Sequence, residues 1–119
     1  DAGTRTASIT GAWLALDQAC RSLVDQGVLE QSPLVDQVAA VSVGLVNGQA
    51  LLDLDYSEDS RAEVDLNVVQ AGDGRLLEIQ GTAEGAPFSR KQLNELLDLA
   101  EPGLSSLMQA QRQAAGKQH

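Results

Sequence analysis

The order of hydrophobic patterns along the chain predicts an α+β fold of two layers, in which a roughly four-stranded sheet has helices packed on it. Apolar residues recur at helical spacing in two long stretches, residues 4–26 and a stretch that follows Ser89. Between these stretches lie about four segments of strand-like sequence, separated by turn residues. A sheet covered by helices on one face is the simplest packing.

The first predicted helix has one apolar stripe and a plausible stop. The stripe consists of Ile9, Trp13, Leu16, Cys20, Leu23 and Val24. Gly27 suits the end of a helix because glycine readily adopts a left-handed backbone. Cys20 is the only cysteine, which excludes an internal disulfide, and its place on the stripe predicts a core residue and not a nucleophile.

The strand-like segments begin with residues 38–46, which are rich in valine. Asn47-Gly48 then gives the strongest short signal for a hairpin turn. The return strand is expected over residues 49–55, and further strands over residues 64–70 and 75–82, in which apolar and polar residues alternate. The alternation predicts that Asp65 and Asn67 lie on the face of the sheet opposite their apolar neighbours.

The last predicted helix begins after Ser89, which is suited to an N-cap. Its apolar stripe consists of Leu93, Leu96, Leu97, Ala100, Leu104, Leu107 and Met108. Pro102 interrupts the stripe, so we expect either a kinked helix or two helices end to end.

Composition limits the possible functions. The net charge of −9 argues against simple electrostatic binding of nucleic acid. His119 is the only histidine, which excludes a serine or cysteine triad of the usual kind. No apolar run approaches the length of a membrane span, so no membrane partner is expected. The chain begins at Asp1, close to the start of the first predicted helix, and we expect that further sequence precedes it.

Residues 52–65 carry six carboxylates and one arginine, a density that a divalent cation would relieve. Carboxylate oxygens suit Mg²⁺ or Mn²⁺. A calcium-binding EF-hand loop starting at Asp53 does not fit, because it requires Gly at Glu58 and Glu at Val64. The alternative is an acidic sheet edge that discourages aggregation.

Gly3-Thr4-Arg5 stands at the start of the first helix, where an anion is favoured. The first N–H groups of a helix have no partner within it, and a guanidinium can hold a phosphate with two hydrogen bonds. The alternative is an ordinary helix start with a solvent-facing arginine. Phosphate on one side and a metal on the other would indicate phosphoryl-transfer chemistry.

Several consecutive blocks, in order, resemble ribonuclease PH from residue 1 to about residue 113. They are Gly3-Thr4-Arg5-Thr6-Ala7-Ser8-Ile9-Thr10-Gly11-Ala12, Asp36-Gln37-Val38-Ala39-Ala40-Val41-Ser42-Val43-Gly44, Leu51-Leu52-Asp53-Leu54-Asp55-Tyr56, Glu58-Asp59-Ser60 and Glu78-Ile79-Gln80-Gly81-Thr82-Ala83-Glu84-Gly85-Ala86-Pro87-Phe88-Ser89. The resemblance implies the ribonuclease PH / ribosomal protein S5 domain 2-like fold. It also implies a phosphorolytic 3′-to-5′ exoribonuclease that trims tRNA precursors and releases nucleoside diphosphates.

The resemblance also implies roles for particular residues and partners. Gly3, Thr4 and Arg5 would bind the attacking inorganic phosphate. Asp59 and Asp65 would be the catalytic pair that supports Mg²⁺ or Mn²⁺. Family members are cytoplasmic, process tRNA and rRNA, and assemble as a hexameric ring, a trimer of dimers.

The chain is about half as long as members of this family and resembles only their C-terminal half. Residues 1–31 would be the helix region that ends the first domain, residues 36–116 the second domain, and residues 117–119 a tail. The missing half would carry a further phosphate-contacting arginine and most of the basic RNA-contacting surface. The alternatives are a non-catalytic ring subunit of an exosome-like assembly, an inactive fragment of the enzyme, or a small acidic metal-binding module.

Overall fold

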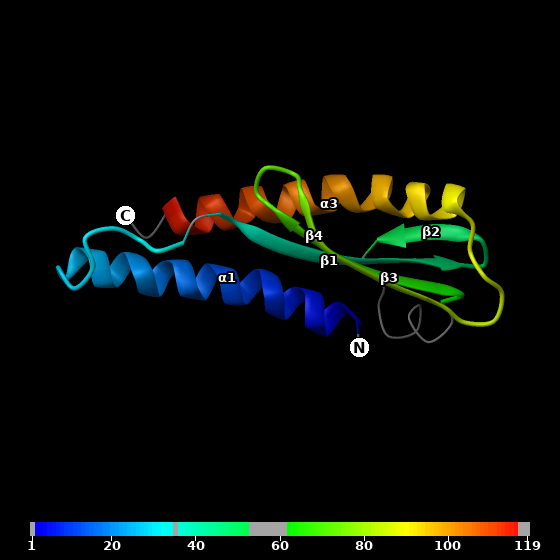
Figure 1. Ribbon diagram of the computed structural model, residues 1–119, viewed down its shortest axis with the longest axis horizontal. Helices are drawn as coiled ribbons and strands as arrows, with labels where there is room; N and C mark the ends of the chain where they lie inside the picture. The colour runs from blue at the N-terminus through cyan, green and yellow to red at the C-terminus, as the bar shows by residue number, and fades with distance from the viewer. Residues whose placement is uncertain (1, 35, 53–61, 117–119) are drawn as a thin grey trace.

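The computed structural model describes residues 2–34, 36–52 and 62–116, which form one sheet and two helices. The sheet has four strands in the order β2-β1-β3-β4, and each neighbouring pair is antiparallel (Figure 1). The elements in chain order are α1 (Ala2–Asp25), β1 (Val38–Val46), β2 (Gln49–Leu52), β3 (Val64–Ala71), β4 (Leu76–Ala83) and α3 (Arg90–Gly116). The predicted fold of about four strands with packed helices is confirmed.

The turn between β1 and β2 is the tight hairpin that the sequence predicts. Asn47 has φ 53° and Gly48 has φ 77°, and Val46 pairs with Gln49 across the turn. Two consecutive positive φ angles define the hairpin turn whose twist matches that of the flanking strands, and Asn-Gly is the sequence that adopts it most readily.

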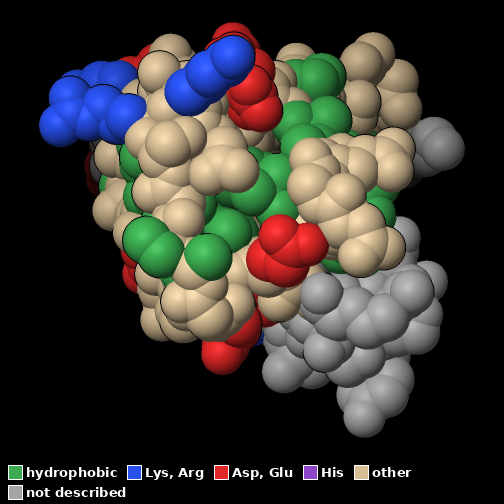
Figure 2. All heavy atoms as spheres, turned by 90° about the vertical axis from the view of Figure 1, so that its right-hand side faces the viewer, with side chains coloured by type: hydrophobic (Ala, Val, Ile, Leu, Met, Phe, Trp, Pro, Cys, Tyr) green, Lys and Arg blue, Asp and Glu red, His purple; other side chains and the backbone are tan. Residues whose placement is uncertain are grey.

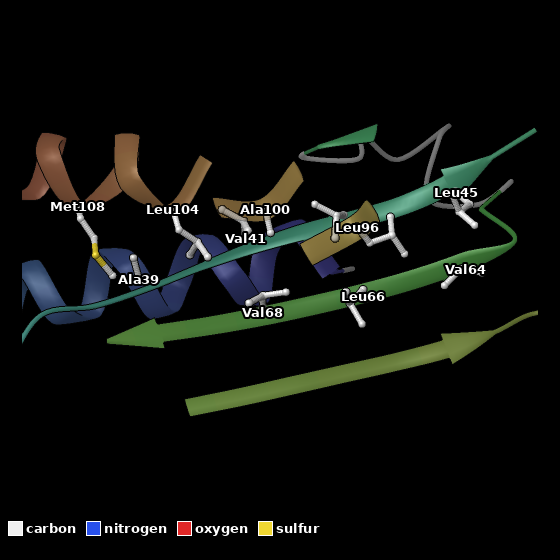
Figure 3. Packing of buried hydrophobic residues seen from close by; sticks show 11 residues of the cluster. Ala39, Val41, Leu45, Val64, Leu66, Val68, Leu96, Ala100, Leu104 and Met108 are labelled. Atoms are coloured by element: carbon white, nitrogen blue, oxygen red, sulfur yellow. The ribbon is translucent and has the colours of Figure 1, made fainter. Parts of the chain in front are cut away.

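The hydrophobic core lies between α3 and one face of the sheet. Alternate residues of β1 and β3 point toward the helix, and Leu96, Ala100 and Leu104 of α3 point back (Figure 3). The core cluster consists of Ala39, Val41, Val43, Leu45, Val64, Leu66, Val68, Leu96, Ala100, Leu104 and Met108. The buried members of this core are aliphatic side chains at strand spacing on one layer and helical spacing on the other, and the partly buried Phe88 packs against them.

The helix α3 begins at the cap that the sequence predicts and continues through its proline. Ser89 Oγ accepts a hydrogen bond of 3.1 Å from the Gln92 N–H, while the Ser89 N–H donates to Gln92 Oε1 at 2.8 Å, a reciprocal capping box. The structure has one helix across Pro102 and not two. A Cβ built on Gly103 would lie 2.9 Å from Leu52, so a glycine after the proline allows α3 to approach β2 closely.

The helix α1 lies on the other side of the sheet from α3, mainly against β1 (Figure 1). Its predicted apolar stripe is only partly buried, because Leu16 is 52% exposed and Leu23 is 38% exposed. The residues on the side of α1 that faces the protein recur every three or four positions. They are Thr6, Thr10, Trp13, Asp17 and Cys20, all buried or half-buried. The predicted burial of Cys20 is confirmed. Leu16 and Leu23, which belong to the predicted apolar stripe, lie on the exposed side of α1.

The α3 core predicts a large difference between two leucine truncations. Leu104 is 1% exposed, whereas Leu77 on β4 is 61% exposed. Leu104→Ala should lower the free energy of unfolding by about 2–5 kcal/mol, because it leaves a cavity beneath α3. Leu77→Ala should lower it by less than about 1 kcal/mol. Urea denaturation measures both, and equal losses would contradict this placement of the core.

Candidate functional site

The face of the sheet opposite the α3 core carries polar side chains. Asp65 and Asn67 alternate with the core residues of β3 and therefore point away from α3. In the strand register, Asn67 stands opposite Ser42 on one side and Gln80 on the other, and Asp65 stands opposite Thr82. These residues form what we call the polar face of the sheet.

The position of α1 on the polar face of the sheet is fixed by a side chain that bonds to the backbone of β1. Among the described residues, β2 pairs with β1 at residues 43–46. Further back along β1, the Ala40 N–H donates to Thr10 Oγ1 at 3.0 Å, and the Thr10 hydroxyl lies 3.3 Å from the Ala40 carbonyl oxygen, to which it donates. The Thr10 hydroxyl thus satisfies both backbone hydrogen-bonding groups of Ala40.

A buried glutamine joins α1, β1 and α3 at the same end of the sheet. Gln111 is 3% exposed, and its Nε2 donates to the carbonyl oxygens of Thr10 and Val38, both at 3.0 Å. Gln37 Nε2 donates to Gln111 Oε1 at 3.0 Å. Trp13 Nε1 also donates to the carbonyl oxygen of Asp36 at 2.8 Å. These bonds hold α1 in one orientation relative to the sheet.

The orientation of α1 places Arg5 over the polar face. Arg5 Nη2 lies 2.7 Å from Glu78 Oε1 on β4, and the two side chains are 44% and 42% exposed. Gly3 and Thr4 lie in the first turn of α1, whose N–H groups have no partner within the helix. The three residues predicted to bind phosphate therefore share one helix start, and the guanidinium has a carboxylate partner that the sequence analysis did not foresee.

Asp65 lies on the same face as Glu78 but in a different row of the sheet. Asp65 is half-buried on β3, and Glu78 stands opposite Val69, four residues further along that strand. A rise of about 3.4 Å per residue separates the two rows by about 14 Å. Asp59, the other predicted metal ligand, lies outside the described residues.

The oxygen atoms around Asp65 suit a hard divalent cation. Asn67 Oδ1 and Ser42 Oγ are both buried, and neither has a hydrogen-bond partner among the described residues. Amide and carboxylate oxygens are ligands that Mg²⁺ or Mn²⁺ accepts, directly or through bound water. Within residues 2–34, 36–52 and 62–116, no three acidic, histidine or cysteine side chains gather closely enough to hold a metal by themselves.

The sequence predicts Asp65 and Asn67 on one face of the sheet, but it did not single out Asn67, Ser42 or Glu78 as candidate site residues. The period-2 alternation of β3 was a usable signal for Asn67, since it shares a face with Asp65. Ser42 and Glu78 gave no local signal, because their significance depends on strand register and on contacts between distant segments.

Basic side chains form no continuous patch on the end of the molecule that Figure 2 shows. Among the coloured residues, the basic groups lie near the top, on the side of α3, and hydrophobic and isolated acidic side chains occupy the centre. Broad RNA contact usually requires a basic surface.

No helix in the described part of the chain is long and apolar enough to cross a membrane.

Residues 36–103 match the family model of the 3′ exoribonuclease family, domain 2. The chain therefore belongs to the 3′ exoribonuclease family. It is 97% identical over 114 residues to the ribonuclease PH of Synechococcus sp. (strain CC9605) and 72% identical to that of Parasynechococcus marenigrum (strain WH8102). Each alignment covers 96% of this chain and 46% of the relative. The resemblance to the C-terminal half of ribonuclease PH is confirmed, and the chain spans about half the length of these curated relatives.

A solved structure supports the fold independently. The crystal structure of rice (Oryza sativa) Rrp46 superposes with a TM-score of 0.62 over 86% of this chain and 46% of the rice chain. The two sequences are 17% identical in this comparison, so the likeness concerns the fold alone.

The contact between Thr10 and Ala40 predicts that a single hydroxyl group stabilises the site. Thr10→Val keeps the shape of the side chain but leaves the Ala40 N–H without this acceptor. It should cost about 1–3 kcal/mol of unfolding free energy and reduce hydrogen-exchange protection in α1. Thr82→Val, at an exposed position of β4, is the matched control. No difference between the two variants would show that Thr10 does not fix α1.

Proposed function

We propose that this chain is the C-terminal part of a phosphorolytic 3′-to-5′ exoribonuclease that trims the 3′ ends of tRNA precursors and releases nucleoside diphosphates. The observation that carries the proposal is that Arg5, paired with Glu78, lies on the same face of the sheet as Asp65, in a row about 14 Å away. Membership of the 3′ exoribonuclease family and 97% identity to part of a ribonuclease PH support it.

The helix start would bind the inorganic phosphate that attacks the RNA. Arg5 offers several N–H donors, and the unpaired N–H groups of the first turn add a favourable dipole. In phosphorolysis, a phosphate oxygen bonds to the phosphorus of the last phosphodiester, and the bond from that phosphorus to the 3′ oxygen of the preceding nucleotide breaks. A nucleoside diphosphate leaves, and the shortened RNA keeps a free 3′ hydroxyl group. Arg5 would position the nucleophile and offset the repulsion between the two anions.

Asp65 and Asp59 would hold Mg²⁺ or Mn²⁺, and the buried Oδ1 of Asn67 is an additional oxygen near Asp65. When bound, the metal supplies positive charge that stabilises the developing charge on the scissile phosphate. Asp65 itself is placed by a strand that is hydrogen-bonded on both sides, so its carboxylate is preorganised for this role.

The remainder of a longer protein would supply what this chain lacks. With a net charge of −9, the chain is poorly suited to hold RNA alone, so the basic RNA-contacting surface would come from the preceding half. The exposed side of α1, which includes Leu16 and Leu23, is suited to packing against that half. We further propose a hexameric ring, a trimer of dimers, in the cytoplasm.

A non-catalytic ring subunit of an exosome-like assembly is the alternative. The ion pair between Arg5 and Glu78 favours it, because a guanidinium held by a carboxylate can serve a structural purpose only. Loss of phosphate-dependent activity on substitution of Arg5 distinguishes the two proposals.

Arg5→Ala in a full-length enzyme that carries this sequence should raise the apparent KM for phosphate by about 10-fold or more, because a charged hydrogen-bond donor is lost. Arg5→Lys should keep only part of the wild-type affinity for phosphate, since an ammonium group lacks the planar arrangement of donors of a guanidinium. Arg21→Ala, on the same helix but paired with Asp17, is the control. An unchanged KM for phosphate together with a collapse of RNA binding would make Arg5 an RNA contact.

Asp65→Asn or Asp59→Asn should lower the rate of phosphorolysis by about 100-fold or more, because the charge that holds the metal is lost. Mn²⁺ binding, followed by electron paramagnetic resonance, should weaken in parallel, while the circular dichroism spectrum stays unchanged. Asp73→Asn, in the exposed β3–β4 turn, is the control. Wild-type rates in either variant would refute the metal assignment.

A further inference from the structure

We propose that Glu78 is an internal competitor of phosphate for Arg5 and that it sets the affinity of the phosphate site. The inference rests on the proposed function, in which Arg5 binds the attacking phosphate. It adds a residue that weakens binding of this substrate, so that the site responds to changes in phosphate concentration without saturating early.

The ion pair joins two elements that are each held in place by other contacts. Arg5 and Glu78 are 73 residues apart in the sequence, and their nitrogen and oxygen atoms lie 2.7 Å apart. Hydrogen bonds to Thr10 and Gln111 hold α1 in place, and Glu78 lies within β4, opposite Val69 of β3. The carboxylate is therefore kept within reach of the guanidinium whether or not phosphate is present.

The charge of this pair determines how an approaching anion is attracted. A free guanidinium presents one positive charge to phosphate, whereas the pair of Arg5 and Glu78 is neutral. The Glu78 oxygen also occupies a donor on Nη2, one of the nitrogens that a phosphate held by two hydrogen bonds would use. Phosphate must then displace the carboxylate or share the guanidinium with a neighbouring negative charge.

The exposure of the pair makes this displacement feasible. The side chains are 44% and 42% exposed, so water reaches both. Exposed ion pairs contribute little net stability, and their breakage does not disturb the fold. Glu78 can therefore release Arg5 to phosphate and recover it afterwards.

Glu78 could instead hold Arg5 in the orientation that phosphate needs, and we call this role a clamp. The two roles predict opposite changes in phosphate affinity when Glu78 is substituted. A clamp would improve phosphate binding, so its removal would weaken binding. A competitor would weaken binding, so its removal would strengthen it. The direction of the change separates the two roles.

The test is Glu78→Gln in the full-length enzyme, with inorganic phosphate as the probe. We expect the dissociation constant for phosphate, measured by calorimetry, and the KM for phosphate to fall by about three- to tenfold at low ionic strength. The KM for RNA should stay unchanged, and the gain should shrink as salt is added. Glu95→Gln removes the same charge from α3, on the other side of the sheet, and should change neither constant. Unchanged or weaker phosphate binding in Glu78→Gln would overturn the inference.

The double variant Arg5→Ala with Glu78→Gln separates this inference from the proposed function. If Glu78 acts through Arg5, its substitution should have no effect on phosphate binding once Arg5 is gone. If Arg5→Ala alone leaves phosphate binding unchanged, the proposed function of the site fails. If Arg5→Ala weakens binding but Glu78→Gln does not strengthen it, only the role of Glu78 fails.

Discussion

The hydrogen bonds between the Thr10 side chain and the backbone of Ala40 are the interaction on which the position of α1 depends. In the described part of the chain, β2 pairs with only four residues of β1, and Ala40 lies beyond them. A buried N–H group without an acceptor is costly, and the Thr10 hydroxyl supplies that acceptor from α1. The helix is therefore positioned by a backbone requirement of the sheet. Its start, with Arg5, is carried over the polar face as a consequence.

The two faces of the sheet carry different kinds of side chain. Aliphatic side chains of β1, β3 and α3 form the core, in which Leu66, Leu96 and Leu104 are almost fully buried. The opposite face holds Asp65, Asn67 and other polar groups that would be destabilising within such a core. Period-2 alternation places neighbouring residues of one strand on these two different faces.

Much of the fold could be predicted from local sequence, since local rules decided it. Asn47-Gly48 defined the hairpin because few other pairs adopt two positive φ angles, and Ser89 defined a helix start because its hydroxyl caps the backbone. The rotation of α1 could not be predicted in this way. This helix has an apolar stripe that includes Leu16 and Leu23, and a second stripe that includes Thr6 and Asp17. Hydropathy favours burial of the first stripe, whereas the structure buries the second, on the side from which Thr10 bonds to the backbone of β1.

The candidate site was predictable only in part. The alternation of β3 placed Asp65 on the polar face, and the helix pattern placed Gly3, Thr4 and Arg5 at a helix start. The partner of Arg5 was not predictable, because Glu78 reaches it only after the sheet and α1 have packed together. Asp59 lies outside the described residues, so its predicted pairing with Asp65 remains a prediction.

The identity of the product tests the central claim most directly. A full-length enzyme that contains this chain would be incubated with an RNA substrate and isotopically labelled inorganic phosphate. Phosphorolysis predicts that the label enters the terminal phosphate of released nucleoside diphosphates and that no release occurs without phosphate. Release of unlabelled nucleoside monophosphates at a rate independent of phosphate would show hydrolysis and contradict the account.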